Sequence, residues 1–77
     1  MDLRARLSTV LTSISEHKEK ELEWYRGLIE ATSRKDLRAI ESYCKKLGAV
    51  ELLIQDLKIE VESLQEDIEA ESREEIL

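Results

Sequence analysis

The chain has 77 residues and a formal net charge of −6, with one cysteine, one histidine and no proline. A single domain, residues 1–77, is the largest unit that this length allows, and such a chain buries only about 60% of its unfolded surface. Because one cysteine and one histidine provide neither an internal disulfide nor a four-ligand zinc site, self-association is the remaining source of extra stability.

The first predicted helix spans about residues 3–31. Its apolar side chains recur at spacings of three and four residues, which places them on one face of a helix. His17 and Glu21 occupy the same stripe and interrupt it in the middle. The apolar members of the stripe are Leu3, Leu7, Val10, Ile14, Trp24 and Leu28. We therefore expect an amphipathic helix whose packing face is apolar towards both ends.

A turn is predicted at about residues 32–33, after this stripe ends. Ser33 is a residue type that caps helix starts, and Asp36 three residues later completes a capping-box-like pattern. Neither glycine nor proline marks the junction. A single bent continuous helix is therefore the alternative to two helices joined by a tight turn.

The second predicted helix spans about residues 34–73 and is followed by a frayed acidic C-terminus. An apolar repeat of 3.5 residues, kept over about four heptads, is typical of a left-handed coiled coil. Heptad positions a are Ile40, Leu47, Ile54, Val61 and Ile68, and positions d are Tyr43, Val50, Leu57 and Leu64. Cys44, beside this stripe, is expected to be a small buried side chain. Gly48 either lets a neighbouring backbone approach closely or is a tolerated, exposed glycine.

Folding the chain back at the turn gives the predicted fold class: an all-α, two-helix antiparallel hairpin of coiled-coil type with a longer second helix. The fold brings all three aromatic side chains towards the closed end and places Arg4 and Arg6 opposite Glu60 and Glu62. The predicted hairpin core consists of Trp24, Tyr25, Leu28, Leu37, Ile40, Tyr43 and Leu47.

The second predicted helix is longer than the first by about 15 Å, at a rise of 1.5 Å per residue. Residues from about 64 onward would lack a neighbouring helix although the apolar repeat continues, and an exposed apolar stripe needs a partner. We therefore predict that hairpins assemble into a homo-oligomeric helical bundle. The predicted oligomer interface is Ile54, Leu57, Val61, Leu64 and Ile68.

Motifs that carry chemistry are not found in the sequence. It has no glycine-rich phosphate loop and no dinucleotide-binding motif. His17 and Glu21 offer only two metal ligands one turn apart, and Cys44 has no nearby base that would make it a nucleophile. We expect no enzyme activity, no cofactor and no metal site, with His17 exposed to solvent.

The charge is unevenly distributed along the chain. Residues 51–77 hold ten acidic and two basic residues, whereas residues 1–50 hold eight acidic and ten basic residues. A strongly acidic end repels phosphate backbones and anionic lipids, so neither nucleic acid nor membrane is an expected partner. The absence of an apolar run at the start and the single cysteine favour a cytoplasmic location. The candidate acidic docking face is Glu66, Glu69, Glu71, Glu74 and Glu75.

Two classes of function fit these features. The first is a non-catalytic, self-associating adaptor or assembly (scaffolding) protein that binds a larger protein, for example in a viral particle or a secretion machine. A transcriptional regulator without its own DNA reader is a variant of this class that the sequence does not separate. The alternative is a small acidic helical inhibitor of phage or mobile-element type, which binds a basic groove of a nucleic-acid-handling enzyme.

Overall fold

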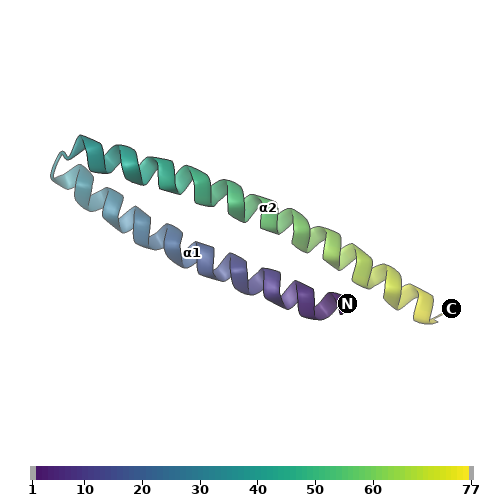
Figure 1. Cartoon of the computed structure of the whole chain (residues 1–77). Coiled ribbons are helices and arrows are strands. Elements are labelled where there is room, and N and C mark those ends of the chain that lie inside the picture. Colours follow the sequence, from purple (N-terminus) through teal and green to yellow (C-terminus); the bar gives the residue numbers. More distant parts are fainter. Residues whose placement is uncertain (1, 77) are drawn as a thin grey trace.

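The computed structural model describes residues 2–76, with side chains for residues 2–74, and shows two helices folded into an antiparallel hairpin (Figure 1). Helix α1 spans Leu3–Ser33 and helix α2 spans Leu37–Ile76. The hairpin measures 63 × 16 × 14 Å, and both termini lie at the open end, where α2 extends beyond the start of α1 (Figure 1). The predicted all-α hairpin with a longer second helix is therefore confirmed.

Each helix begins at an aspartate that caps it. The carboxylate of Asp2 accepts a hydrogen bond of 3.0 Å from the backbone N–H of Arg4. The carboxylate of Asp36 accepts one of 3.2 Å from the backbone N–H of Ala39. Both bonds satisfy N–H groups of a first helical turn, which have no partner inside the helix. The prediction that Ser33 caps the second helix is wrong, because Ser33 is the last residue of α1.

The turn lies at residues 34–36, later than the predicted 32–33. Lys35 adopts a left-handed conformation, with φ of 57°. Its backbone N–H donates to the carbonyl of Thr32 at 3.1 Å, and the N–H of Asp36 donates to the carbonyl of Ala31 at 3.0 Å. This pair of bonds is the Schellman ending of a helix, which reverses the chain within a few residues. Glycine usually occupies the left-handed position, so a lysine there gave no signal in the sequence.

The core is a single seam between the two helices. One cluster of buried side chains contains Val10, Ile14, Val50, Ile54 and Leu64, and Leu3, Leu7, Trp24, Leu57 and Val61 pack against it. Ala31 and Leu47 are also buried. All of these residues except Ala31 belong to the two predicted apolar stripes, which confirms that the stripes face each other. Knobs-into-holes packing, which would define a coiled coil, stays a prediction.

The structure corrects several assignments close to the seam. Tyr25 and Leu37, predicted in the hairpin core, are exposed. Tyr25 follows the seam residue Trp24 and so lies on the flank of α1, and Leu37 is the first residue of α2. Cys44 is exposed and not buried. Gly48 faces open space, so the close approach is excluded there. Helix α2 also continues to Ile76, three residues beyond its predicted end.

Candidate protein interaction surface

The five residues predicted as the oligomer interface lie instead in the hairpin's own seam. Ile54 and Leu64 are each 5% exposed, and Leu57 and Val61 pack against the same cluster. Ile68 is half-buried and lies close to Leu3 near the start of α1. Because the turn comes later than predicted, α1 reaches further along α2 than expected. An interaction between hairpins therefore has to use a different surface.

Exposed apolar side chains gather on one lateral side of the hairpin. The exposed large apolar residues are Leu11, Leu22, Tyr25, Ile29, Leu37, Leu52, Leu53 and Ile59. On α1, Leu22, Tyr25 and Ile29 are spaced three and four residues apart, and Leu11 lies two heptads before Tyr25, so all four share one flank. We call this flank, together with Leu37 on α2, the Tyr25 face.

A hydrogen bond between the helices fixes which side of α2 belongs to this face. The phenol of Tyr25 donates to the carboxylate of Glu51 at 2.8 Å. Leu37 and Cys44 precede Glu51 by two heptads and one heptad, so they project from the same side of α2. The hydrogen bond to Glu51, and then the negative charge of Glu51, raise the pKa of the Tyr25 phenol above its ordinary value of 10.0.

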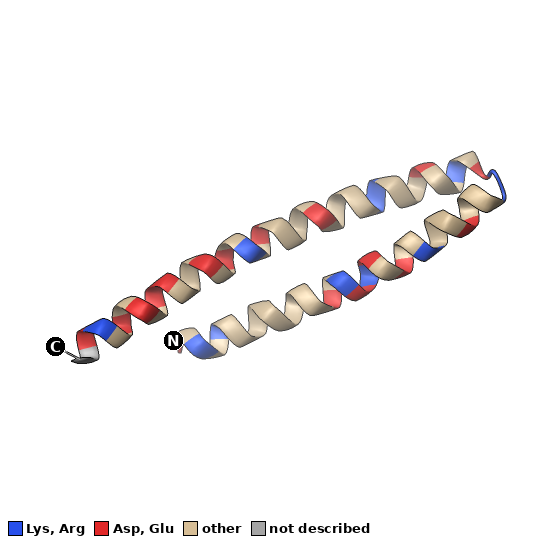
Figure 2. Ribbon diagram, turned by 180° about the vertical axis from the view of Figure 1, so that it is seen from behind, with Lys and Arg blue, Asp and Glu red and all other residues tan. Residues whose placement is uncertain are grey.

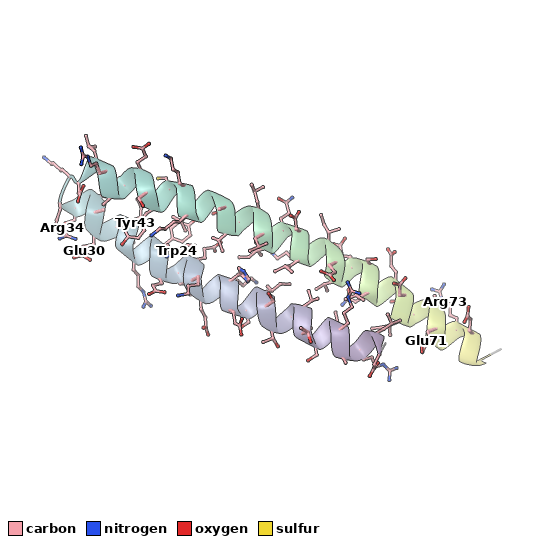
Figure 3. All side chains as sticks on the ribbon, viewed as in Figure 1. Trp24, Glu30, Arg34, Tyr43, Glu71 and Arg73 are labelled. Carbon is pink, nitrogen blue, oxygen red and sulfur yellow. The ribbon has the colours of Figure 1, made fainter. Side chains whose placement is uncertain are left out.

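The opposite lateral side is held together mainly by charge. Arg6 forms an ion pair of 2.9 Å with Glu60, as the predicted antiparallel alignment requires. Lys46 lies above the rings of Trp24 and Tyr43, at 5.9 and 5.4 Å from their centroids. The rings of Trp24 and Tyr43 lie between the helices near the closed end (Figure 3). Leu53, 44% exposed, lies on this side too, since it is one heptad from both Lys46 and Glu60. The contacts that join the helices therefore differ between the two lateral sides.

The two flanks of α1 differ in their content of charged residues. On α1, the stripe of residues 11, 15, 18, 22, 25 and 29 contains one charged residue, Lys18. The opposite stripe, residues 6, 9, 13, 16, 20, 23, 27 and 30, contains five charged residues. Depletion of charge around exposed apolar side chains is typical of surfaces that become buried in complexes.

The acidic residues form the second candidate site, at the open end. Glu66, Glu69, Glu71 and Glu74 are exposed, while the side chain of Glu75 lies outside the described residues. Figure 2 shows the concentration of acidic positions along this part of α2. Helical spacing places Glu66 and Glu69 on one side of α2 and Glu71 and Glu74 on the other. The predicted single acidic face is therefore an acidic helix end that carries charge on two sides.

His17 is half-buried in the seam and not fully exposed as predicted. Its Nδ1 lies 2.6 Å from the backbone carbonyl of Ser13, so the ring nitrogen donates to that carbonyl. Within the described part of the chain, no group of three or more His, Cys, Asp or Glu side chains is placed to hold a metal ion. His17 therefore serves as a polar member of the packing seam.

Comparisons with protein-family models, with curated proteins and with solved structures found no match to this chain. Neither α1 nor α2, over the residues described, has an apolar stretch long enough to cross a membrane. The function is therefore argued from the exposed surface of the hairpin.

Proposed function

We propose that this protein is a non-catalytic protein–protein interaction module that self-associates and serves as an adaptor or assembly protein for a larger protein partner. The observation that carries the proposal is the Tyr25 face. It comprises five exposed apolar side chains, Leu11, Leu22, Tyr25, Ile29 and Leu37, on one side of the hairpin, where the flank of α1 carries little charge. A group of exposed apolar side chains on one surface is typical of an interaction site.

The surface area of the hairpin supports the same proposal. The chain exposes 6254 Å² of accessible surface. A compact monomeric protein of 9.0 kDa exposes only about 4,900 Å². The excess of roughly 1,400 Å² per chain is larger than the roughly 800 Å² that each partner of a standard protein–protein interface buries. Covering the Tyr25 face would bring the exposed area of each hairpin closer to that of a compact fold.

Solution mass is the experiment that tests self-association. We expect light scattering on a sizing column to give at least twice the mass of one chain, and circular dichroism to show loss of helix on dilution of the same sample. A helical monomer at every concentration would contradict self-association. The adaptor function would then depend on a different protein occupying the Tyr25 face.

Matched glutamate substitutions test the surface itself. We expect Leu22→Glu, in the middle of the Tyr25 face, to shift the mass to that of a single chain. Leu52→Glu is the control, since Leu22 and Leu52 are exposed to similar extents, 59% and 66%. Leu52 projects from the side of α2 that points away from α1, so its substitution leaves the mass unchanged.

The acidic end supports a second candidate function, inhibition of an enzyme that handles nucleic acid. Four exposed glutamates lie on both sides of the last turns of α2, and among the described residues the nearby cations are Arg73 and Arg4. Such a rod of negative charge is complementary to a groove that binds a phosphate backbone. The competing measurement is displacement of a labelled DNA duplex from RNA polymerase or a nuclease, followed by fluorescence anisotropy. Replacing Glu66, Glu69, Glu71, Glu74 and Glu75 with glutamine should abolish displacement, and an unchanged effect would contradict this candidate.

A further inference from the structure

Charge differs strongly between the two halves of the hairpin. Residues 17–20 lie beside residues 49–53, so about residues 18 and 52 mark the middle of the stretch in which α1 lies beside α2. The half nearest the turn, residues 18–52, holds eight basic and seven acidic residues. The half at the open end, residues 1–17 and 53–77, holds four basic and eleven acidic residues. The formal charges are therefore +1 near the turn and −7 at the open end.

We propose that the Tyr25 face is covered by a second copy of the chain in the antiparallel orientation, with the turn of each hairpin beside the open end of the other. This inference rests on the proposed self-association and adds the occupant, the face and the orientation. The result is a four-helix bundle with a two-fold axis perpendicular to the long axis of the hairpin. In this arrangement α1 packs on the α1 of the partner and α2 on its α2.

Charge complementarity selects this orientation over the alternative. If both turns lay at the same end, the two open halves would be adjacent, each with a formal charge of −7. Like charges placed side by side across an interface are unfavourable. The antiparallel arrangement separates the acidic halves by most of the length of the bundle and places each beside a half of slightly positive charge.

The composition of the Tyr25 face allows the same surface to serve both copies. A two-fold interface must be self-complementary, because the same patch is used twice. With the two-fold axis at about residue 18, Tyr25 of each copy lies opposite Leu11 of the other, because both are seven residues from the axis. The excess exposed area of roughly 1,400 Å² per chain is also larger than the 800 Å² or so that each partner of a standard interface contributes.

A distance measurement between the two turns tests the orientation. The sole cysteine is replaced by Cys44→Ser, and Arg34→Cys then provides one exposed spin-label site at the turn, outside the Tyr25 face. The turn lies about 24 Å from residue 18 at 1.5 Å per residue, so an antiparallel dimer with its axis at residue 18 separates the two labels by about 50 Å. We expect electron–electron dipolar spectroscopy to find this separation. Labels within about 20 Å of each other would overturn the antiparallel orientation, since both turns would then lie at the same end.

The mass of the same labelled protein separates the possible failures. A monomeric mass would refute self-association itself, and with it the four-helix bundle. A dimer with adjacent turns would refute only the orientation.

To test the face, we expect Leu22→Glu combined with Ile29→Glu to raise the dimer dissociation constant at least 100-fold. A dimer that resists this pair but is disrupted by Leu52→Glu would show that the second copy occupies a different surface.

Discussion

The ring of Tyr43 lies directly against the backbone of Gly27, so that a methyl group on Gly27 would come within 2.5 Å of the ring. A close approach to a glycine, one of the two alternatives for Gly48, therefore occurs at Gly27, where the neighbour is an aromatic side chain. The absence of a side chain in the middle of α1 leaves room for Tyr43 near the closed end. Glycine in a helix costs about 1 kcal/mol relative to alanine. At Gly27 this cost is the condition for the Tyr43 ring to pack against the helix.

The two glycines are therefore expected to respond oppositely to alanine. Gly48→Ala should stabilise the hairpin by about 0.5–1 kcal/mol, because nothing lies within 4 Å of the added methyl group. Gly27→Ala should give no gain or a loss, because Tyr43 must move. Urea unfolding measures both free energies. In a Tyr43→Leu background the ring is absent, and Gly27→Ala should then become stabilising; if it does not, the ring is not the cause.

Lys35 offers a second test of backbone conformation. With φ of 57° it is the one non-glycine residue with positive φ among those described. The left-handed conformation costs a residue with a Cβ atom about 1–2 kcal/mol, and glycine avoids this cost. We expect Lys35→Gly to stabilise the hairpin by roughly 1 kcal/mol in thermal or urea unfolding. Lys35→Ala removes the same charge but keeps the Cβ atom, so it should not reproduce the gain.

The periodicity of the sequence predicted the hairpin and most of its seam. The spacing of Leu3, Val10 and Ile14 on one helix, and of Val50 and Ile54 on the other, depends only on the geometry of a helix with one apolar face. Val10, Ile14, Val50 and Ile54 are buried as expected, and Leu3 is half-buried against them. Burial of apolar area is the main favourable term in folding, which is why the periodic signal was sufficient for this level of structure.

The errors arose where a single residue decides the outcome. The turn was placed too early because its deciding feature is the left-handed conformation of Lys35, a conformation for which lysine has no preference. A shift of two or three residues at the turn moved the whole alignment of the helices. The predicted alignment therefore places Leu64 in an overhang, whereas Leu3 and Leu7 pack against the cluster that contains it. Tyr25 was assigned to the core because aromatic residues favour burial, whereas its hydroxyl reaches Glu51 at the edge of the seam.

The hydrogen bond between Tyr25 and Glu51 predicts an effect of alkaline pH. Because the folded-state pKa of Tyr25 is raised, the contribution of the pair to stability is present below the unfolded-state pKa of about 10 and is lost as pH rises through the folded-state pKa. In Tyr43→Phe protein, where Tyr25 is the only tyrosine, tyrosinate absorbance should titrate above pH 10.0. Glu51→Gln should lower that midpoint. Equal midpoints in the two proteins would show that the pair does not form in solution.

The ion pair of Arg6 with Glu60 should contribute little, although it confirms the antiparallel alignment. Their side chains are 51% and 36% exposed, and exposed ion pairs contribute about 0–1 kcal/mol. A double-mutant cycle with Arg6→Gln and Glu60→Gln should give a coupling energy within this range that falls as salt is added. A coupling well above 1 kcal/mol, or one that does not change with salt, would mean that the pair is shielded from solvent, for example by a second chain.

The effect of Leu64→Ala at different protein concentrations shows whether Leu64 packs within one hairpin or between two chains. At 5% exposure within one hairpin, Leu64→Ala should lower the free energy of unfolding by about 2–4 kcal/mol. A Gly48→Ala background offsets about 0.5–1 kcal/mol of this loss. Leu52→Ala is the control, because an exposed side chain at 66% should change stability by no more than about 0.5 kcal/mol. The loss at Leu64 should be the same at every protein concentration, because its contacts are made within one chain. If the loss instead shrinks towards zero on dilution, Leu64 contributes to stability through contacts between chains.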